Sequence, residues 1–474
     1  MKTPSLLFLL TLLAYSAFSQ TNIPDTINAE PVTELQTVQT PLNTLITALM
    51  VNNASYWSKT VIYRSTDNGA TWDSVFSYGS GGGFNATPDP VLTVDDAGIV
   101  YMTAMRHLPL GGGFTAHLWM WRSTDDGLTW SLASTPYTGN AFADYPSLTS
   151  AENGLVYLSY THYDPDTSYV RFTSSTDAGS TWANVSTFGT LPNSGWNAVG
   201  SDLGWGHNGK LFLSYGDYNY NVVYYTSSND SGATWAPVQN TPVASGAMFL
   251  ITKIVSSNNY SHLGIIAHRP HAVTDIYYVT SLDEGNSWQY QTISNNSAYC
   301  EGVIDAAGTV HLVYNESLGT PRLCYKYSGD EGQTFSSTLT LLPWTSVSLT
   351  AGEYQSLLIG NDGLLHVTYV DWNEAGTAKH LVFAPMVTDI YLTDPSTHAP
   401  RIFPNPAHDV LSFRSDETIA GGRYDLIDIS GKTITGGTVT LPLTTVDISS
   451  LDAGTYLLHV STGNVTWVQK VVKN

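Results

Sequence analysis

Ionisable and aromatic residues of kinds that bind or transform small molecules gather at the ends of short alternating segments. One set follows such segments: Trp57, Arg106, His107, His162, Tyr163, Asp217, His268, Arg269, His271, Arg322 and Trp372. A second set precedes them: Asp89, Asp144, Trp196, Asp202, Glu301, Glu353 and Tyr354. Arginine forks match carboxylates, while histidines and carboxyl groups transfer protons. These residue types indicate a ligand site if the fold brings them to one mouth.

An eight-residue phrase, Ser-x-Asp-x-Gly-x-Thr-Trp and close variants, recurs between the strands that would position these residues. Its six copies are Ser65–Trp72, Ser123–Trp130, Ser175–Trp182, Ser228–Trp235, Ser281–Trp288 and Ser328–Phe335. A repeat of about 50 residues with short alternating strands is typical of a β-propeller. The sequence therefore predicts an all-β fold.

A second recurring feature is a tight turn followed by an alternating strand, as in Asn153-Gly154 and Asp362-Gly363. Such pairs supply the positive φ that a two-residue hairpin needs. Each unit then contains four strands, and inner strands are expected near Glu34, Pro90, Tyr145, Gly200, Met248, Tyr299 and Tyr354. We predict a seven-bladed propeller over residues 30–388, with six blades as the alternative.

The eight-residue phrase resembles the Asp-box of sialidase-like propellers. A carboxylate in a tight turn accepts hydrogen bonds from nearby backbone N–H groups, and the tryptophan packs between sheets. The aspartates of the six copies are therefore expected to be structural: Asp67, Asp125, Asp177, Asp230, Asp283 and Asp330. The resemblance places these turns on the face opposite the binding site.

The resemblance to sialidases also implies catalytic roles. Three arginines would hold a substrate carboxylate, for which Arg106, Arg269 and Arg322 are the candidates. Tyr354, activated by Glu353 or Glu301, would be the nucleophile, and Asp89 or Asp144 the acid. The chain departs from that family because the Arg-Ile-Pro motif that opens sialidases is absent. The expected function is that of a secreted or cell-surface carbohydrate-active propeller, for which the resemblance implies a sialidase-like glycoside hydrolase.

Two other functions fit the same residues. In a polysaccharide lyase, His107, His162, His268 or His271, with a tyrosine such as Tyr163, would abstract a proton beside a uronate carboxylate neutralised by Arg269. A non-catalytic surface propeller would instead bind glycan or protein through Trp57, Trp196 and Trp372. No cofactor is evident, and a metal requirement is left open.

Composition and the first residues indicate export. Lys2, the apolar run Leu6–Leu13 and Ala17-Phe18-Ser19 form a signal peptide over residues 1–19. The formal charge of -21 argues against a nucleic-acid partner, and no stretch is long enough to cross a membrane. Cys300 and Cys324 are expected on strands separated by a third, as free buried thiols. We expect a monomer that binds an extracellular glycan.

The last part of the chain differs in character. Residues 389–400 read as a linker, and residues 401–474 as a small β-sandwich. Four motifs in this part of the chain, taken together, match a known domain: Phe403-Pro404-Asn405-Pro406-Ala407, Asp428-Ile429-Ser430-Gly431-Lys432, Gly454-Thr455-Tyr456-Leu457-Leu458 and Lys470-Val471-Val472-Lys473. They resemble the C-terminal sorting domain of the type IX secretion system of Bacteroidetes. The resemblance implies partnership with that machinery and a secreted or outer-membrane-surface location in a Gram-negative bacterium.

Overall fold

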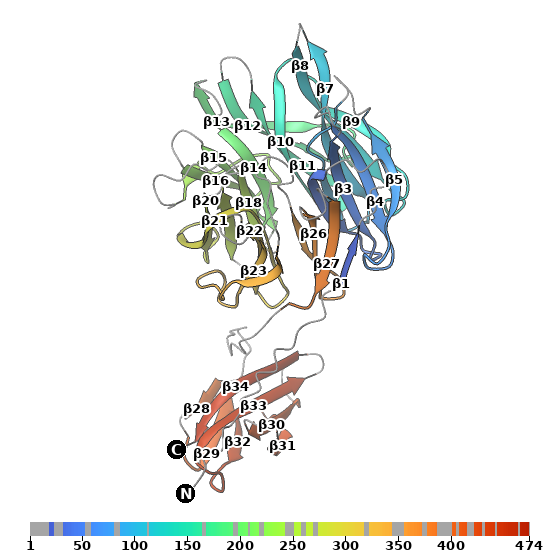
Figure 1. Ribbon diagram of the computed structural model, residues 1–474. Helices are drawn as coiled ribbons and strands as arrows, with labels where there is room; N and C mark the ends of the chain where they lie inside the picture. Colours follow the sequence, from blue (N-terminus) through green and yellow to red (C-terminus); the bar gives the residue numbers. More distant parts are fainter. Residues whose placement is uncertain are drawn as a thin grey trace, which may run out of the picture. The chain divides into compact units, whose positions relative to one another are not determined.

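A computed structural model shows an almost entirely β protein (Figure 1). It describes residues 19–22, 32–52, 58–79, 86–110, 113–163, 167–192, 198–206, 209–217, 222–241, 251–256, 262–268, 274–316, 322–343, 355–371, 377–385, 401–403, 407–414, 421–428, 432–440, 443–462 and 465–473. The chain divides into two compact units, Met1–Val387 and Thr388–Asn474.

Antiparallel pairing groups the strands of the first unit into four-stranded sheets. The first sheets comprise β2 (Val32–Gln39), β3 (Leu45–Asn52), β4 (Ser58–Ser65) and β5 (Asp73–Tyr78); β6 (Val91–Val94), β7 (Val100–Leu110), β8 (Gly113–Ser123) and β9 (Ser131–Tyr137); then β10 (Phe142–Ala151), β11 (Leu155–Tyr163), β12 (Thr167–Ser175) and β13 (Ala183–Pro192). One short 3₁₀ turn, Glu152–Gly154, joins β10 to β11.

The remaining sheets follow the same order. They comprise β14 (Ala198–Trp205), β15 (Leu211–Asp217), β16 (Val222–Ser228) and β17 (Gln239–Asn240); β18 (Ile251–Ser256), β19 (Leu263–His268), β20 (Thr274–Ser281) and the start of β21 (Gln289–Ile304); the end of β21 with β22 (Val310–Glu316), β23 (Arg322–Ser328) and β24 (Leu339–Pro343); and β25 (Ser356–Ile359), β26 (Leu365–Asp371), β27 (Thr377–Phe383) and β1 (Ser19–Asn22). Strand β1 lies beside β27 and completes the last sheet (Figure 1).

The inner strands form a closed cycle. Contacts run from β2 through β6, β10, β14, β18, β21 and β25, and β25 contacts β2 again. At this last joint the Thr37 N–H donates to Ser356 Oγ at 3.0 Å, and Thr37 Oγ1 bonds Thr368 Oγ1 at 2.7 Å. The first unit is therefore a β-propeller. The cycle supports the predicted count of seven blades, which stays a prediction.

Each copy of the eight-residue phrase forms a turn closed by its aspartate. In the first copy, Asp67 accepts hydrogen bonds from the Thr71 N–H (2.8 Å), Thr71 Oγ1 (2.6 Å) and Ser65 Oγ (2.8 Å). The other five copies repeat these bonds at Asp125, Asp177, Asp230, Asp283 and Asp330. Hydrogen bonds to the ionised carboxylate lower the pKa of these groups, to about 2 for Asp230.

The glycine of each turn docks the turn onto the preceding sheet. Gly232 has φ +83°, and a Cβ at this position would collide with the ring of Phe172. The same holds for Gly69, whose Cβ would meet His380 in the last sheet. Asn68 Nδ2 also donates to Asp362 Oδ2 at 2.6 Å beside that contact. The first turn thus docks onto the last sheet, which helps to close the ring.

The two cysteines lie on β21 and β23, on either side of β22 in the sheet. Both thiols are buried and free, as predicted. Burial raises the pKa of both groups, which keeps them protonated and unreactive.

The second unit has two small sheets. One contains β28 (Arg401–Phe403), β29 (Val410–Arg414) and β32 (Leu443–Asp447), and the other contains β31 (Thr433–Thr438), β30 (Arg423–Asp428), β33 (Gly454–Thr462) and β34 (Val465–Lys473). Leu411 and Phe413 of the first sheet share one apolar core with Leu426 and Leu458 of the second. Two sheets packed over a common core make the β-sandwich that the alternating pattern predicts.

Glycine docking yields a stability prediction. Gly232→Ala should lower the free energy of unfolding by about 2–5 kcal/mol, because it adds left-handed strain to a collision with Phe172. Gly363→Ala is the matched control: its φ is +76° but nothing lies within 4 Å of the added Cβ. The free energy of unfolding of Gly363→Ala should then fall only by the backbone strain, about 1–2 kcal/mol. Equal losses in chemical denaturation of the two variants would contradict the docking role.

Candidate functional site

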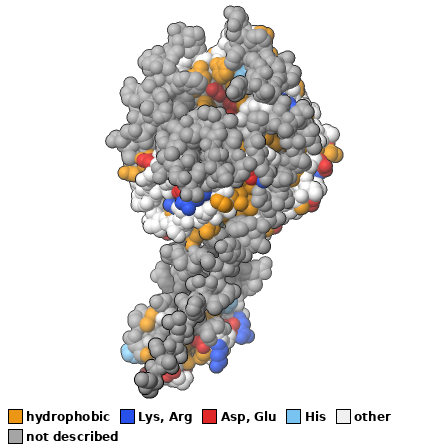
Figure 2. All heavy atoms as spheres, viewed as in Figure 1, with side chains coloured by type: hydrophobic (Ala, Val, Ile, Leu, Met, Phe, Trp, Pro, Cys, Tyr) orange, Lys and Arg blue, Asp and Glu red, His pale blue; other side chains and the backbone are white. Residues whose placement is uncertain are grey.

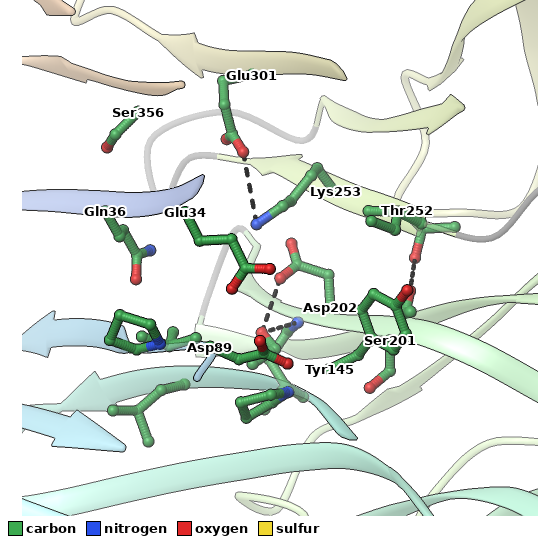
Figure 3. A pocket seen from close by; sticks show the side chains of 18 of the residues that line it. Glu34, Gln36, Asp89, Tyr145, Ser201, Asp202, Thr252, Lys253, Glu301 and Ser356 are labelled. Carbon is green, nitrogen blue, oxygen red and sulfur yellow. Dashed lines mark hydrogen bonds and ion pairs between the residues drawn. The ribbon is translucent and has the colours of Figure 1, made fainter. Parts of the chain in front are cut away.

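The start of the inner strands surrounds a cavity of about 250 Å³ (Figure 3). Every sheet of the propeller contributes lining residues, among them Glu34, Gln36, Asp89, Val91, Tyr145, Ser147, Asp202, Lys253, Glu301, Gln355 and Ser356. The repeated turns lie elsewhere, since Asp126 of the second turn bonds Thr40 and Thr44 beyond the far end of β2. The cavity therefore opens between the ends of the inner strands that lie away from those turns.

Hydrogen bonds between neighbouring sheets hold one ring of lining residues in place. The Leu92 N–H donates to Gln36 Oε1 at 2.6 Å. The Leu203 N–H donates to Ser147 Oγ at 3.1 Å. Ser147 Oγ in turn donates to Asp202 Oδ1 at 2.7 Å. Each bond joins one inner strand to the next, so these lining groups also fix the sheets around the cavity.

On one side of the cavity a lysine lies between two carboxylates. Lys253 Nζ is 3.5 Å from Glu301 Oε1, and the two side chains are 29% and 22% exposed (Figure 3). Burial opposes the charge of Lys253, but Glu301 and Asp202 together raise its pKa. Burial raises the pKa of Glu301, against the attraction of Lys253. Glu301 is thus a carboxylate with a fixed counter-charge that faces the cavity.

A second cluster contains three acids. Asp89 is hydrogen-bonded to Glu34 and Asp144, and the Tyr145 N–H donates to Asp144 Oδ1 at 2.9 Å. Burial, followed by the charge of Glu34, raises the pKa of Asp89 well above its usual value. Burial and the charge of Asp89 do the same for Asp144. Like charges this close cannot all be ionised, so the cluster retains a proton near neutral pH.

Backbone strain accompanies the acids. Asp89 and Tyr145 have φ of +55° and +48°, in the left-handed region that non-glycine residues seldom occupy. The register of β10 shifts between Asp144 and Ser147, which marks a bulge at the same place. Bulges and positive φ re-aim side chains and are concentrated at functional sites. Here they accompany the turn of the acids toward the axis.

The structure brings only part of the predicted catalytic set together. Asp89 and Glu301 line the cavity, and Asp144 bonds Asp89. Arg106 instead lies over the rings of Tyr78 and Trp119, at 5.3 and 5.5 Å from their centroids. Arg322 Nε and Nη2 both contact Glu316 Oε2 at 2.6 Å. Neither arginine lines the cavity, so the geometry gives no support to their proposed carboxylate-binding role. Arg269, Glu353 and Tyr354 lie outside the described residues.

The predicted binding residues that the structure describes do not line the cavity. His162 stacks on Tyr169 with 4.5 Å between centroids, and Asp217 is fully buried. Burial lowers the pKa of His107 to about 4 and that of His268 to about 3, so both rings are neutral at physiological pH. Tyr163 lies near the acid cluster, since Asp144 and Tyr145 add to the effect of burial in raising its pKa. Trp57, Trp196, His271 and Trp372 lie outside the described residues.

Asp202, predicted at the start of an inner strand, lines the cavity, whereas Glu34 and Lys253 are lining residues that the predicted site lacks. A shared position in the repeat could have pointed to the lining residues. Four of them lie three residues before the end of the inner strand at its hairpin: Gln36, Asp202, Lys253 and Glu301. Within the described residues no group of three or more His, Cys, Asp or Glu is arranged to hold a metal ion. In the same part of the chain, no helix is long and apolar enough to cross a membrane.

Comparisons with known proteins agree with this division of the chain. Residues 401–474 match the family described as "Secretion system C-terminal sorting domain". This match indicates type IX secretion and an extracellular or cell-surface location. None of the curated proteins compared matches the chain in sequence.

Among solved structures, the chain is similar to a Penicillium chrysogenum alpha-L-arabinanase (16% identity, TM-score 0.47, covering 78% of this chain and 97% of that one). It is also similar to the Hadza microbial sialidase Hz136 (18% identity, TM-score 0.48, covering 75% and 66%). A third similar structure is a Dyadobacter fermentans protein of unknown function (13% identity, TM-score 0.47, covering 65% and 97%).

The acid cluster yields a prediction on stability and pH. The pKa of Asp89 is raised in the folded state, so the stability that its protonated form contributes is present near pH 4 and is lost as pH rises through that pKa. Asp89→Asn should therefore raise the melting temperature at pH 7–8 and flatten its decline with pH. Asp96→Asn, on an exposed turn of the same sheet, should change neither. A lower melting temperature for Asp89→Asn at pH 8 would show that the carboxyl is stabilised as an anion.

Proposed function

We propose that the propeller is a secreted glycoside hydrolase whose axial cavity cleaves an uncharged glycan. The observation that carries the proposal is the pairing of two kinds of carboxyl group in one cavity. In one cluster, burial and neighbouring charge raise the pKa of Asp89 and Asp144 well above the usual value. Burial also raises the pKa of the other carboxyl, Glu301, but Lys253 Nζ lies 3.5 Å from it and its charge favours the anion. Two carboxyl groups whose environments separate their protonation states are what glycoside hydrolysis requires.

The roles follow from protonation. Asp89, which shares its proton with Glu34 and Asp144, donates it to the glycosidic oxygen as the C–O bond breaks. Glu301 takes the proton from the attacking water. The proton returns to the acid cluster through solvent after product release. Lys253 keeps Glu301 ionised until that step, so it is a positioning residue rather than a catalytic one.

Charge within the cavity supports an uncharged substrate. Among the described residues, Lys253 is the single Lys or Arg that lines it, against the acids Glu34, Asp89, Asp202 and Glu301. A sialic acid or uronate would bring a carboxylate into this negative environment, where none of the described lining residues supplies an arginine fork. On the face that Figure 2 shows, most of the described surface is likewise formed by uncharged side chains and backbone. The sialidase and lyase readings therefore have less support than hydrolysis of a neutral glycan.

The secreted chain should release reducing sugar from at least one member of a panel of neutral polysaccharides. Asp89→Asn and Glu301→Gln should each lower kcat by about 10²–10⁴-fold, because each removes a proton-transfer group. Asp96→Asn is the control of equal charge change and should retain full activity. Unsaturated products would instead favour a lyase. A folded wild-type protein that retains a neutral glycan but cleaves none would be a binding module.

The pH dependence of kcat should follow the two groups. The rate should fall as pH rises through the raised pKa of the acid cluster, because the proton donor is then lost. It should also fall at low pH, where Glu301 becomes protonated. Glu34→Gln should remove the charge that helps to raise the pKa of Asp89 and shift the alkaline limb to lower pH. An alkaline limb that does not move in Glu34→Gln would contradict a proton shared between these carboxyl groups.

A further inference from the structure

A second cavity, of about 290 Å³, lies on the side of the propeller and shares no residue with the axial one. It is bounded by the end of β9 in one sheet and by β11, β12 and the turn before β13 in the next. Tyr137, Gly139, Tyr160, Arg171, Trp182 and Val185 form most of its wall. Its size is near the lower end of small-molecule sites, about 300 Å³. Neither the predicted site nor the proposed hydrolase uses these residues.

Arg171 is the charged group of this cavity. Within the described residues its guanidinium makes no hydrogen bond or ion pair, whereas Arg64 pairs with Asp126 and Arg322 with Glu316. It lies on β12 opposite Tyr160 and is partly exposed. A guanidinium without such a partner among the described residues is unusual in this chain, because its 39 Asp and Glu outnumber its 18 Lys and Arg. The guanidinium fork is therefore available to an anionic ligand.

Trp182 departs from the rule that the other repeats follow. In four copies of the phrase the indole N–H donates to the carbonyl of the glycine in its own turn, as Trp72 does to Gly69 at 3.1 Å. Trp182 Nε1 instead donates to Ser134 Oγ of the neighbouring sheet at 2.9 Å. Ser134 Oγ in turn donates to the Gly179 carbonyl, the group that accepts from the indole in the other copies. The indole N–H thus has a different partner from those of the other four tryptophans, and Trp182 lines the cavity.

Tyr137 lines the cavity from within the core, because its side chain is 9% exposed. Its hydroxyl accepts from the Ala141 N–H at 3.1 Å and contacts the Ala141 carbonyl at 3.3 Å. Its ring lies 5.6 Å from that of Tyr160, which is 2% exposed. Trp182 is the partly exposed aromatic side chain of the cavity. An indole beside a guanidinium that has no hydrogen bond or ion pair among the described residues suits a ligand with an apolar face and an anionic substituent.

We propose that this side cavity binds an acidic saccharide residue. The carboxylate or sulfate of the sugar pairs with Arg171, and the C–H face of the ring lies against Trp182. The hydroxyl of Thr138, exposed at the rim, faces the sugar hydroxyls. Such a site retains the protein on a polysaccharide that carries acidic residues. It goes beyond the proposed hydrolase and does not require that the axial cavity be catalytic.

Binding to the full secreted protein tests the proposal by isothermal titration. The probes are trigalacturonate, a sulfated disaccharide and neutral galactotriose. At least one acidic probe should bind ten times or more tightly than galactotriose, and the two acidic arms decide between carboxylate and sulfate. Arg171→Gln should weaken that binding at least tenfold. Arg64→Gln, which removes the same charge elsewhere, and Asp89→Asn, which alters the axial cavity, should stay within twofold of wild type.

Melting temperatures of the variants separate lost binding from lost folding, and Arg171→Lys adds a second check. It retains the charge but not the fork, so its affinity should fall between those of wild type and Arg171→Gln. The proposal is overturned if Arg171→Gln binds the acidic probe as tightly as wild type. It is equally overturned if wild type prefers neither acidic probe to galactotriose. Neither result would bear on turnover in the axial cavity.

Discussion

The propeller depends on one contact made repeatedly: a turn that is closed by a carboxylate and docked through a glycine onto the preceding sheet. The aspartate satisfies the turn's own donors, as Asp67 does for Thr71 and Ser65. The glycine allows both the positive φ and the close approach, as Gly232 does against Phe172. Because the first turn docks onto His380 of the last sheet, the same contact that spaces the sheets also helps to close the ring.

Ring closure has an electrostatic consequence at the axis. Each sheet contributes between one and four of the described lining residues, and each of these is unremarkable in its own strand. Brought together, Glu34 adds to burial in raising the pKa of Asp89, and Asp89 adds to burial in raising that of Asp144, while Lys253 offsets Asp202 and Glu301. The site is thus a property of the assembled ring, and its chemistry follows from two neighbouring environments with different charge balance. The strained backbone at Asp89 and Tyr145 is sustained by the packed sheets around it.

The two cavities differ in how they relate to the repeat. The axial cavity uses the same position of every sheet, so it follows from the symmetry of the fold. The side cavity exists where the repeat is broken, since Trp182 bonds Ser134 rather than its own glycine. Arg171 lies next to that break and has no internal hydrogen bond or ion pair among the described residues. A departure from an otherwise regular pattern is a place where sequence has been fitted to something other than folding.

The sequence alone determined the repeating architecture, the turn chemistry and the C-terminal sorting domain, because these depend on local residue types at fixed spacing. Inner strands predicted near Pro90, Tyr145 and Gly200 lie where the structure has β6, β10 and β14. Which ionisable residues meet was decided by tertiary structure. Strand side chains alternate between faces, and a one-residue bulge such as that of β10 reverses the alternation. Asp89 and Glu301 therefore reach the axis while Arg106 packs on aromatic rings, a difference that no local pattern carries.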